Sequence, residues 1–325
     1  MSVLRAVPVG CGHYLPARVV PNSEFEATLD TSDAWIRDRT GIERRHFAAE
    51  GELTSHLAIH AARAAMADGG IGAAEIDGLI VATATPDETF PATATRVQHA
   101  IGMTHGFAFD VQAVCAGFIY ALAAANAMIL AGQARTIMVI GAETFSRILD
   151  WTDRSTCVLF GDGAGALILR GETGSGRPDD RGILSVNLNS DGRHHDLLYV
   201  DGGPSSTGRA GHVRMEGREV FRHAVEKLAA AGEQALAQAG LTAADVAWVV
   251  PHQANLRIIR KTADRMGIGM DRVVVTVQEH GNTSAASIPL ALSVANAEGR
   301  FRRGDLILME AIGGGLAWGA AAMRW

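Results

Sequence analysis

Cysteine, lysine and aromatic residues are all scarce in this chain of 325 residues. The three cysteines, Cys11, Cys115 and Cys157, are odd in number, widely spaced and without a CxxC pair, which argues against a disulfide scaffold and a cysteine-rich zinc site. Lysine occurs only at Lys227 and Lys261, so the basic residues are almost all arginine. Hydrophobic residues make up 48% and charged residues 20%, as in a globular protein with a sizeable core.

The sequence also lacks a strong positive charge, a secretory leader and a clear membrane span. The formal net charge of -6 gives no indication of a bulk nucleic-acid binder. The segment MSVLRAVPVGCGHYLP has no long apolar stretch before a small-residue cleavage site, so we expect no signal peptide and a cytoplasmic location. Residues 115–132 approach transmembrane length, but they are alanine-rich and lie between strand-like runs, which favours a buried helix over a membrane segment.

The chain contains an internal repeat with a period of about half its length. The segment GGIGAAEIDGLIV at 69–81 matches AGLTAADVAWVV at 239–250, with an offset of 170 (71 to 241). The run TIMVIGA at 136–142 matches DLILMEA at 305–311, with an offset of 169 (136 to 305). Matches at a nearly constant offset indicate two similar α/β halves that have been fused.

Helical and strand-like segments alternate in each half. In the first half we expect helices at 54–68 and 115–131 and strands at 78–84, 107–112, 136–142 and 163–170. In the second half we expect helices at 217–239, 253–266 and 284–298 and strands at 246–251, 272–277, 305–311 and 317–324. This alternation predicts an α/β fold with buried, mostly parallel sheets. The polar, glycine-rich stretch 171–182 separates an N-terminal half, 1–172, from a C-terminal half, 183–325.

Three polar residues stand where strands are predicted to end. Cys115 opens a helix, and the N-terminus of a helix lowers the pKa of a thiol and so favours the nucleophilic thiolate. His252 follows the strand 246–251, and parallel α/β sheets carry active sites at the carboxyl ends of strands. Asn282 lies in EHGNTSAAS, opposite Cys115 in the repeat at an offset of 167 (115 to 282). Taken singly, a buried cysteine and a capping asparagine are the commoner interpretations, but together the three residues form a candidate site.

Two other motifs give weaker signals. The glycine clusters FGDGAGAL at 160–167 and GGGLAWG at 313–319 run into strand-like segments, whereas a dinucleotide fingerprint requires a following helix. The run His194, His195 and Asp196 has no third ligand at a recognisable spacing, so we interpret it as a solvated loop and expect no metal site.

A basic face is predicted on the helix at 253–266. Its charged members point away from the apolar stripe of the helix; they are Arg257, Arg260, Lys261 and Arg265. A solvated face is the commoner interpretation of such a pattern. On a chain of net negative charge, a local basic patch beside His252 also suits an acidic partner.

The segments FDVQAVCAGF, VVPHQANLRII and EHGNTSAASIP, which surround these three residues, resemble the β-ketoacyl-acyl-carrier-protein synthase III family. The similarity continues through TSDAWIRDRTGI at 31–42, DWTDRSTCVLFGDGAGA at 150–166 and GGGLAWG, in order along nearly the whole chain. It implies a thiolase-like fold, with two duplicated αβαβαββ halves in α-β-α-β-α layers, and a homodimer. It also implies an acyltransferase that starts fatty-acid synthesis by decarboxylative Claisen condensation of a short acyl-CoA, such as acetyl-CoA, with malonyl-acyl-carrier protein, without metal or other cofactor.

The resemblance assigns roles to individual residues. Cys115 is implied as the acyl-accepting nucleophile, and His252 and Asn282 as the pair that assists decarboxylation. The backbone amides of Cys115 and Gly314 are implied as the oxyanion hole. The implied contacts to coenzyme A are Trp35, Arg39, Arg154 and Asn255. Arg257 is implied as the principal residue that docks the acyl carrier protein, and the basic face that it shares with Arg260, Lys261 and Arg265 is the candidate docking surface. The implied acyl-pocket residues are Ile312 and Phe90, the latter reaching from a partner subunit.

Two departures from the family pattern concern the acyl chain. Many members carry an aromatic residue where this chain has Ile312, and alanine where it has Gln112. Three alternatives stay open beside the synthase: a related condensing enzyme of secondary metabolism, of quinolone or polyketide type; a cysteine hydrolase in which His252 is the base for Cys115; and a non-catalytic module that binds the carrier protein.

Overall fold

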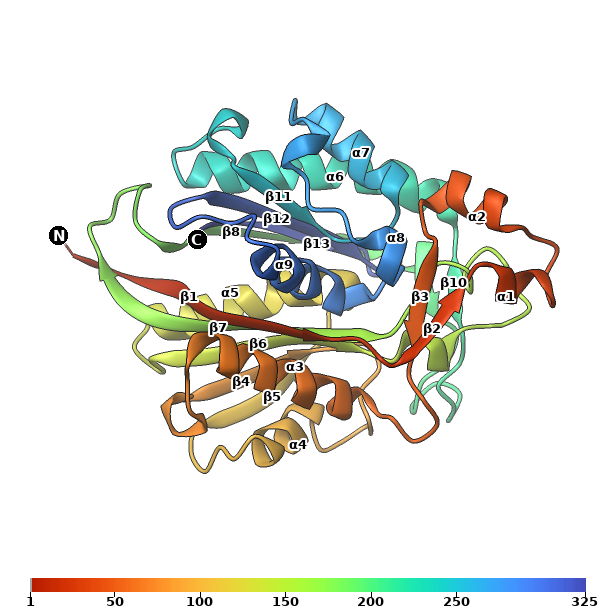
Figure 1. Cartoon of the computed structure of the whole chain (residues 1–325), viewed down its shortest axis with the longest axis horizontal. Helices are drawn as coiled ribbons and strands as arrows, with labels where there is room; N and C mark the ends of the chain where they lie inside the picture. Colours follow the sequence, from red (N-terminus) through yellow and green to blue (C-terminus); the bar gives the residue numbers. More distant parts are fainter. Residues whose placement is uncertain (1) are drawn as a thin grey trace.

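Two large β-sheets run through the molecule, and helices lie above, between and below them (Figure 1). The computed structural model describes residues 2–325. The outer helices over the C-terminal sheet are α6 (Gly217–Gln238) and α7 (Leu256–Arg265). The central helices are α5 (Gly117–Leu130) and α9 (Ser287–Ala297), and the outer helices below the N-terminal sheet are α3 (Thr54–Gly69) and α4 (Thr93–Ala100). This α-β-α-β-α order confirms the predicted thiolase-like fold class.

The N-terminal sheet has five strands in the order β1-β7-β6-β4-β5. Their bounds are β1 (Val3–Tyr14), β7 (Gly163–Gly174), β6 (Thr136–Glu143), β4 (Gly78–Ala82) and β5 (Phe107–Val111). Strand β4 is parallel to β5 and β6, and β7 is antiparallel to β1 and β6. The central strands β4 and β6 are buried along their whole length, which explains why their sequences are continuous apolar runs.

The C-terminal sheet repeats this order with four strands, β11-β12-β13-β8. Their bounds are β11 (Trp248–Pro251), β12 (Leu306–Gly313), β13 (Ala317–Arg324) and β8 (Gly182–Ser190). Strands β11 and β12 are parallel, and β13 is antiparallel to both of its neighbours. Each position in this sheet therefore corresponds to one in the N-terminal sheet, and only the counterpart of β5 is missing.

The prediction of a strand at 272–277 is wrong. Within the described residues this segment forms one isolated bridge, between Val249 and Val273, and then turns into the short helix α8 (Val277–His280). The side-chain amide of Gln253 takes the place of a neighbouring strand. Its Oε1 accepts the backbone N–H groups of Thr276 and Val277 at 2.8 and 3.1 Å, and its Nε2 donates to the carbonyl of Val274 at 3.1 Å. The ladder ends here because a side chain satisfies the backbone.

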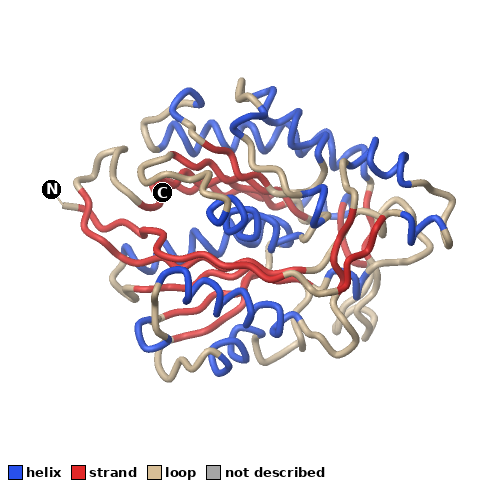
Figure 2. Tube along the Cα trace, viewed as in Figure 1, coloured by secondary structure: helices blue, strands red, loops and turns tan. Residues whose placement is uncertain are grey.

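The central helices are shorter than their sequence patterns suggested. Cys115 lies in a 3₁₀ turn, η2 (Val114–Ala116), ahead of α5, and the C-terminal counterpart η7 (Ser284–Ala286) precedes α9. Helix α7 likewise begins at Leu256, three residues after the predicted start at 253. Figure 2 shows α5 and α9 enclosed between the two sheets, which accounts for their apolar character on all sides. Among residues 2–325, no helix combines the length and the apolar character needed to cross a membrane.

Smaller elements frame one end of the sheets. The two-stranded pieces pair β2 (Arg18–Pro21) with β3 (Arg44–Phe47) and β9 (Leu198–Val200) with β10 (Val213–Met215). The short helices here are α1 (Ser23–Glu26) and α2 (Asp33–Thr40). The remaining 3₁₀ turns are η1 (Ala73–Glu75), η3 (Phe145–Ile148), η4 (Gly192–Leu197), η5 (Ala243–Asp245) and η6 (Met270–Arg272). Most of these additions were not predicted, and α2, β9 and β10 build the mouth of the cavity described below.

Candidate active site

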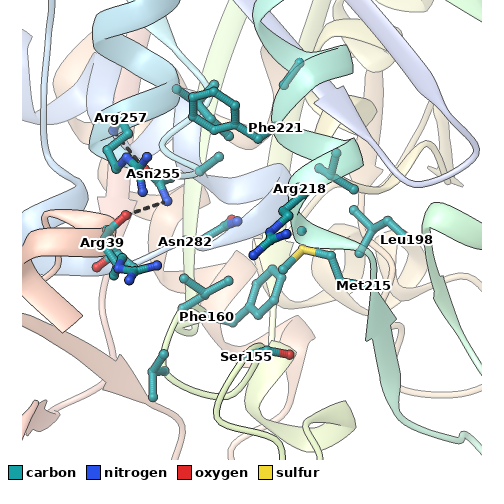
Figure 3. Close-up of a pocket in the computed structure, with 18 of the residues that line it drawn as sticks. Arg39, Ser155, Phe160, Leu198, Met215, Arg218, Phe221, Asn255, Arg257 and Asn282 are labelled. Carbon is teal, nitrogen blue, oxygen red and sulfur yellow. Dashed lines mark hydrogen bonds between the residues drawn. The ribbon is translucent and has the colours of Figure 1, made fainter. Parts of the chain in front are cut away.

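One cavity of about 550 Å³ brings together the three residues singled out by the sequence. Cys115, His252 and Asn282 all line it, and they come from both halves of the chain. The other predicted residues on its wall are Trp35, Arg39, Arg154, Asn255, Arg257 and Ile312. Figure 3 shows Asn282 near the centre of the group of lining residues, with Arg39, Arg257 and Arg218 around it. The structure therefore places most of the predicted site residues around one space.

A strained turn positions Cys115. Its neighbour Val114 has φ +48°, in the left-handed region that a β-branched residue rarely adopts. The tight turn brings the chain from β5 into α5 with Cys115 at the cavity wall. Gly313, at the end of β12, packs directly against this turn, because a Cβ on Gly313 would lie 2.6 Å from the Cys115 nitrogen. A side chain at position 313 would push β12 away from the turn that carries Cys115.

The prediction of a lowered thiol pKa at Cys115 is wrong for the protein without bound substrate. Burial raises the pKa of the Cys115 thiol to about 12, and the nearby Glu143 carboxyl acts in the same direction. The side chain is 3% exposed, so the loss of hydration outweighs the favourable field of the helix N-terminus. The raised pKa favours the neutral thiol in the unloaded site.

The turn that holds Asn282 is the structural counterpart of the nucleophile turn. Ser284 has φ +48°, the same value as Val114. The turns η2 and η7 therefore correspond at a sequence offset of 170 (114 to 284). This corrects the offset of 167 inferred from the sequence. Cys115 corresponds to Ala285, and Asn282 corresponds to the exposed Gln112. The two halves therefore use equivalent turns for different chemistry.

His252 follows the last residue of β11 and is held in a buried position. Its backbone N–H donates to the Glu310 carbonyl at 2.8 Å, and its side chain is 3% exposed. The ring nitrogen Nδ1 lies 2.7 Å from the Ser287 hydroxyl, at the start of α9. Burial lowers the pKa of His252 to about 3, so the imidazole is neutral at physiological pH. A neutral ring has one N–H to donate into the cavity or one lone pair to accept from it.

The side chain of Asn282 has a fixed orientation. Its Oδ1 accepts the backbone N–H of Ser284 at 2.9 Å, which leaves the Nδ2 amide group as the polar end at the cavity. The backbone of Asn282 is pinned to the N-terminal half, because its N–H donates to the Leu159 carbonyl at 2.9 Å and its carbonyl accepts the N–H of Gly161 at 3.0 Å. The cavity thus contains a preset hydrogen-bond donor at Asn282.

Aromatic and cationic side chains surround the mouth. The guanidinium groups of Arg39 and Arg154 lie 5.5 and 5.1 Å from the centre of the Trp35 ring. Arg154 also donates to the backbone carbonyl of Asp30. A flat aromatic ring flanked by cations suits a flat, anionic ligand such as a nucleotide.

The N-terminus of α7 forms another side of the mouth. Asn255 caps this helix, since its Oδ1 accepts the N–H of Arg257 at 2.8 Å, and its Nδ2 donates to the Arg39 carbonyl at 3.2 Å (Figure 3). The Arg257 guanidinium lies 5.7 Å from the centre of the Phe221 ring. Within residues 2–325 no ion pair involves the four cations of the predicted basic face, Arg257, Arg260, Lys261 and Arg265, and all four are exposed.

Several residues on the cavity wall were missed by the sequence reasoning. Arg218, in the first turn of α6, points into the cavity from the wall formed by α6 (Figure 3). It adds a further cation to the mouth. The apolar wall includes Phe160, Leu198, Met215 and Phe221. The segment GREVF has no unusual spacing, so only the docking of α6 beside β10 reveals Arg218.

The two predicted acyl-pocket residues lie in different places. Ile312 is buried on the cavity wall and packs with Ala224, Ile258 and Leu316. Phe90 is 82% exposed and does not line the cavity of its own chain. Its place in an acyl pocket therefore depends on a partner subunit and stays a prediction. Gly314, predicted for the oxyanion hole, follows β12 directly, and a Cβ there would lie 2.5 Å from the Leu198 carbonyl oxygen.

The other two cysteines do not line this cavity. Both are buried, Cys11 in β1 and Cys157 in a turn. Burial raises the pKa of Cys11 to about 12 and that of Cys157 to about 11. Neither is placed to act on a ligand bound between the halves. Among residues 2–325 no group of three or more His, Cys, Asp or Glu side chains is arranged to hold a metal ion.

The fold and the cavity together define a class, the thiolase-fold condensing enzymes. Residues 109–192 match the family model for 3-oxoacyl-[acyl-carrier-protein] synthase III, and residues 236–325 match the model for its C-terminal part. The β-ketoacyl-[acyl-carrier-protein] synthase III of Ruegeria pomeroyi is 70% identical over 321 residues, which cover 99% of each chain. This chain belongs to the β-ketoacyl-[acyl-carrier-protein] synthase III family.

Solved structures agree with this assignment. The synthase III of Aquifex aeolicus is 44% identical and aligns with a TM-score of 0.92, covering 98% of this chain and 100% of that one. A priming β-ketosynthase of a polyketide biosynthetic pathway is also similar, with 35% identity and a TM-score of 0.91 over 99% of this chain and 96% of that one. The fold therefore serves both types of priming enzyme, and the sequence identity favours the first.

Proposed function

We propose that this protein condenses a short acyl-CoA, with acetyl-CoA as the expected substrate, with malonyl-acyl-carrier protein to start fatty-acid synthesis. The observation that carries the proposal is the meeting of Cys115, His252 and Asn282 on the wall of one cavity whose mouth is cationic. A nucleophile and two neutral polar groups suit a reaction that moves an acyl group and then stabilises an enolate.

In the first half-reaction the Cys115 sulfur attacks the thioester carbon of acyl-CoA. The C–S bond to coenzyme A breaks, and the proton of the buried thiol ends on the departing coenzyme A sulfur, so the step is balanced without an external base. The negative charge on the carbonyl oxygen develops at an oxyanion hole formed by the backbone amides of Cys115 and Gly314. The close packing of β12 against the nucleophile turn supports this assignment, because it brings the two segments together.

In the second half-reaction malonyl-carrier protein loses carbon dioxide. The electron pair of the broken C–C bond moves into the thioester, and its oxygen becomes an enolate. Asn282 Nδ2 and His252 donate hydrogen bonds to this oxygen. The carbanion carbon then attacks acyl-Cys115, releases β-ketoacyl-carrier protein, and leaves a thiolate that takes a proton from water. Among residues 2–325, no carboxylate lines the cavity to repel the malonyl charge.

The mouth is proposed to bind coenzyme A and the carrier protein in turn. Trp35 and Arg154 hold the adenine, Arg39 meets the phosphates, and Asn255 contacts the pantetheine arm. The unpaired cations of α7, together with Arg218 at the cavity wall, support docking of an acidic carrier protein beside the opening. We also propose that the protein is a cytoplasmic homodimer without metal or other cofactor, in which Phe90 reaches the acyl pocket of the partner.

A mass and gas-release experiment tests the proposed function. Acetyl-CoA without malonyl substrate should add one acetyl group to the protein by intact mass, and Cys115→Ala should abolish this adduct. Addition of malonyl-carrier protein should then release carbon dioxide and form a β-ketoacyl product. Free acetate without a new C–C bond would instead identify the hydrolase alternative. An adduct on Cys11 or Cys157 would refute the assignment of the nucleophile.

A further inference from the structure

The ring of His252 has one direct side-chain partner among the described residues, the hydroxyl of Ser287. The distance from Ser287 Oγ to His252 Nδ1 is 2.7 Å. The same oxygen also accepts the backbone N–H of Gln253 at 3.2 Å. Both side chains are buried, so bulk water does not compete for these bonds.

The hydrogen-bonding capacity of the Ser287 hydroxyl decides which ring nitrogen carries the proton. A serine hydroxyl has one proton to donate and two lone pairs to accept with. The N–H of Gln253 points at one lone pair. Within residues 2–325 the only acceptor recorded for the proton of Ser287 is Nδ1 of His252. Nδ1 therefore accepts, and because burial keeps the ring neutral, the ring proton is on Nε2.

We propose that Ser287 is a positioning residue that holds His252 as the Nε2–H tautomer, so that His252 presents a hydrogen-bond donor to the thioester oxygen. The proposal rests on the proposed function, because only an enolate oxygen requires this donor. Each of the two proposed donors is then oriented by one serine. The hydroxyl of Ser287 fixes the tautomer of the His252 ring, and the backbone amide of Ser284 fixes the orientation of the Asn282 side chain.

The surroundings of Ser287 keep this arrangement rigid. Gln253, whose N–H fixes the hydroxyl, is itself anchored by its side chain, which donates to the carbonyls of Pro251 and Val274 at 2.8 and 3.1 Å. Its Oε1 accepts two further backbone N–H groups at 2.8 and 3.1 Å. The unusual replacement of a strand by this glutamine therefore also serves the active site.

This tautomer determines which half-reaction His252 can assist. A ring that already carries its proton on Nε2 cannot accept the Cys115 proton at that nitrogen. His252 is thus suited to decarboxylation and is not the resting base for Cys115, in contrast to the hydrolase alternative. Loss of Ser287 should therefore affect the second half-reaction selectively.

NMR spectroscopy can determine the tautomer of the His252 ring directly. In protein labelled with ¹⁵N on histidine, two-bond proton–nitrogen correlation spectra distinguish a protonated ring nitrogen from an unprotonated one. The His252 signals are those lost in His252→Gln. We expect Nε2 of His252 protonated and Nδ1 unprotonated in the unmodified protein. A protonated Nδ1 would overturn the proposal, and this reading does not depend on catalytic activity.

Kinetics of Ser287→Ala provide the second test. The variant should lower the rate of carbon dioxide release by acetylated enzyme about tenfold, the scale of one lost hydrogen bond to a reacting group, and leave acetylation of Cys115 within about twofold. KM for malonyl-carrier protein should stay unchanged, because the bond acts on the enolate and not on the bound substrate.

The same helix supplies a matched control. Ser293 lies 2.8 Å from Nδ1 of His13, is also buried, and does not line the cavity. Ser293→Ala removes an equivalent serine–histidine bond and should leave carbon dioxide release unchanged. Equal losses in the two variants, or equal losses of acetylation and decarboxylation in Ser287→Ala, would show a merely structural role. If the unmodified protein forms no acetyl adduct and no β-ketoacyl product, the proposed function fails instead, whatever the tautomer.

Discussion

Removing the donor of Asn282 should separate the chemistry of the site from its stability. Asn282 does two things: its Oδ1 accepts the N–H of Ser284 at 2.9 Å, and its Nδ2 faces the cavity. Asn282→Ala removes both functions. Asn282→Asp keeps an oxygen for the Ser284 bond and replaces the donor by an acceptor. Comparison of the two variants therefore assigns each effect to one atom.

The magnitudes follow from the position of the side chain. Loss of one preorganised donor in a buried oxyanion site costs about 2.7–4 kcal/mol, or about a hundred- to a thousandfold in the rate of decarboxylation. Loss of the Ser284 bond costs about 1 kcal/mol of folding free energy. Asn282→Ala should show both losses. Asn282→Asp should also show the loss in the rate of decarboxylation. At low pH, where the buried carboxyl is neutral, it should lose less folding free energy than Asn282→Ala does.

The pH dependence of Asn282→Asp gives an additional signature. Burial raises the pKa of a carboxyl above its usual value of about 3.9. As the pH falls through that raised pKa, the carboxyl gains a proton that it can donate to the enolate. Carbon dioxide release by Asn282→Asp should therefore rise relative to the unmodified protein as the pH falls, whereas Asn282→Ala should show no such recovery.

The assay is single-turnover release of carbon dioxide from malonyl-carrier protein by acetylated enzyme, with thermal unfolding measured in parallel. Gln112→Ala is the control, because Gln112 is the exposed counterpart of Asn282 in the other half. Decarboxylation at the unmodified rate in Asn282→Ala would refute the role of the donor. A loss of the same size in Gln112→Ala would show that the assay reports disturbance of the fold.

Three further predictions concern Cys115, the docking surface and the acyl pocket. Because burial raises the pKa of Cys115 to about 12, alkylation by iodoacetamide should increase about tenfold per pH unit from pH 7 to 10 without a plateau; a plateau below pH 8 would contradict a neutral thiol. Arg257→Glu and Arg265→Glu should each lower kcat/KM for malonyl-carrier protein about five- to a hundredfold, and the loss should be smaller at high salt. Arg265→Glu should leave acetylation by acetyl-CoA unchanged. Equal losses of kcat/KM with both substrates would exclude docking of the carrier protein at α7. Ile312→Phe should reduce the ratio of hexanoyl-CoA to acetyl-CoA turnover by about tenfold or more, and an unchanged ratio would exclude Ile312 from the acyl pocket.

Local sequence patterns were reliable where an element is fully buried. The strand at 317–324 was predicted with the observed bounds, and the strand at 136–142 ends one residue later than expected. These segments are buried nearly throughout, so their apolar sequences report their environment directly. The segment 272–277 (RVVVTV) is rich in β-branched residues, like 136–142, but the side chain of Gln253 takes its backbone hydrogen bonds. A competing group that is distant along the chain cannot be seen in a local pattern.

Motif position identified Cys115, His252 and Asn282, because the order of strands and turns along the chain sets which residues reach the carboxyl ends of the sheets. The duplication was likewise evident from the repeat, and the layered fold was implied by the family resemblance. The properties of the three groups depend on tertiary structure. The helix start at Cys115 predicted a low pKa, yet the packing of Gly313 and the neighbouring turn removes water and raises it.

The amino-acid sequence by itself indicated the two halves, the order of most of their elements and the candidate residues that meet in one cavity, because these depend on periodicity and on spacing along the chain. Tertiary structure decided the protonation of Cys115, the orientation of Asn282 and the partner of His252, because hydration and hydrogen-bond geometry depend on which distant segments meet. Ser287 illustrates the difference. As one serine in EHGNTSAASIP it has no distinguishing pattern, and only the docking of α9 beside the end of β11 places its hydroxyl 2.7 Å from the imidazole of His252.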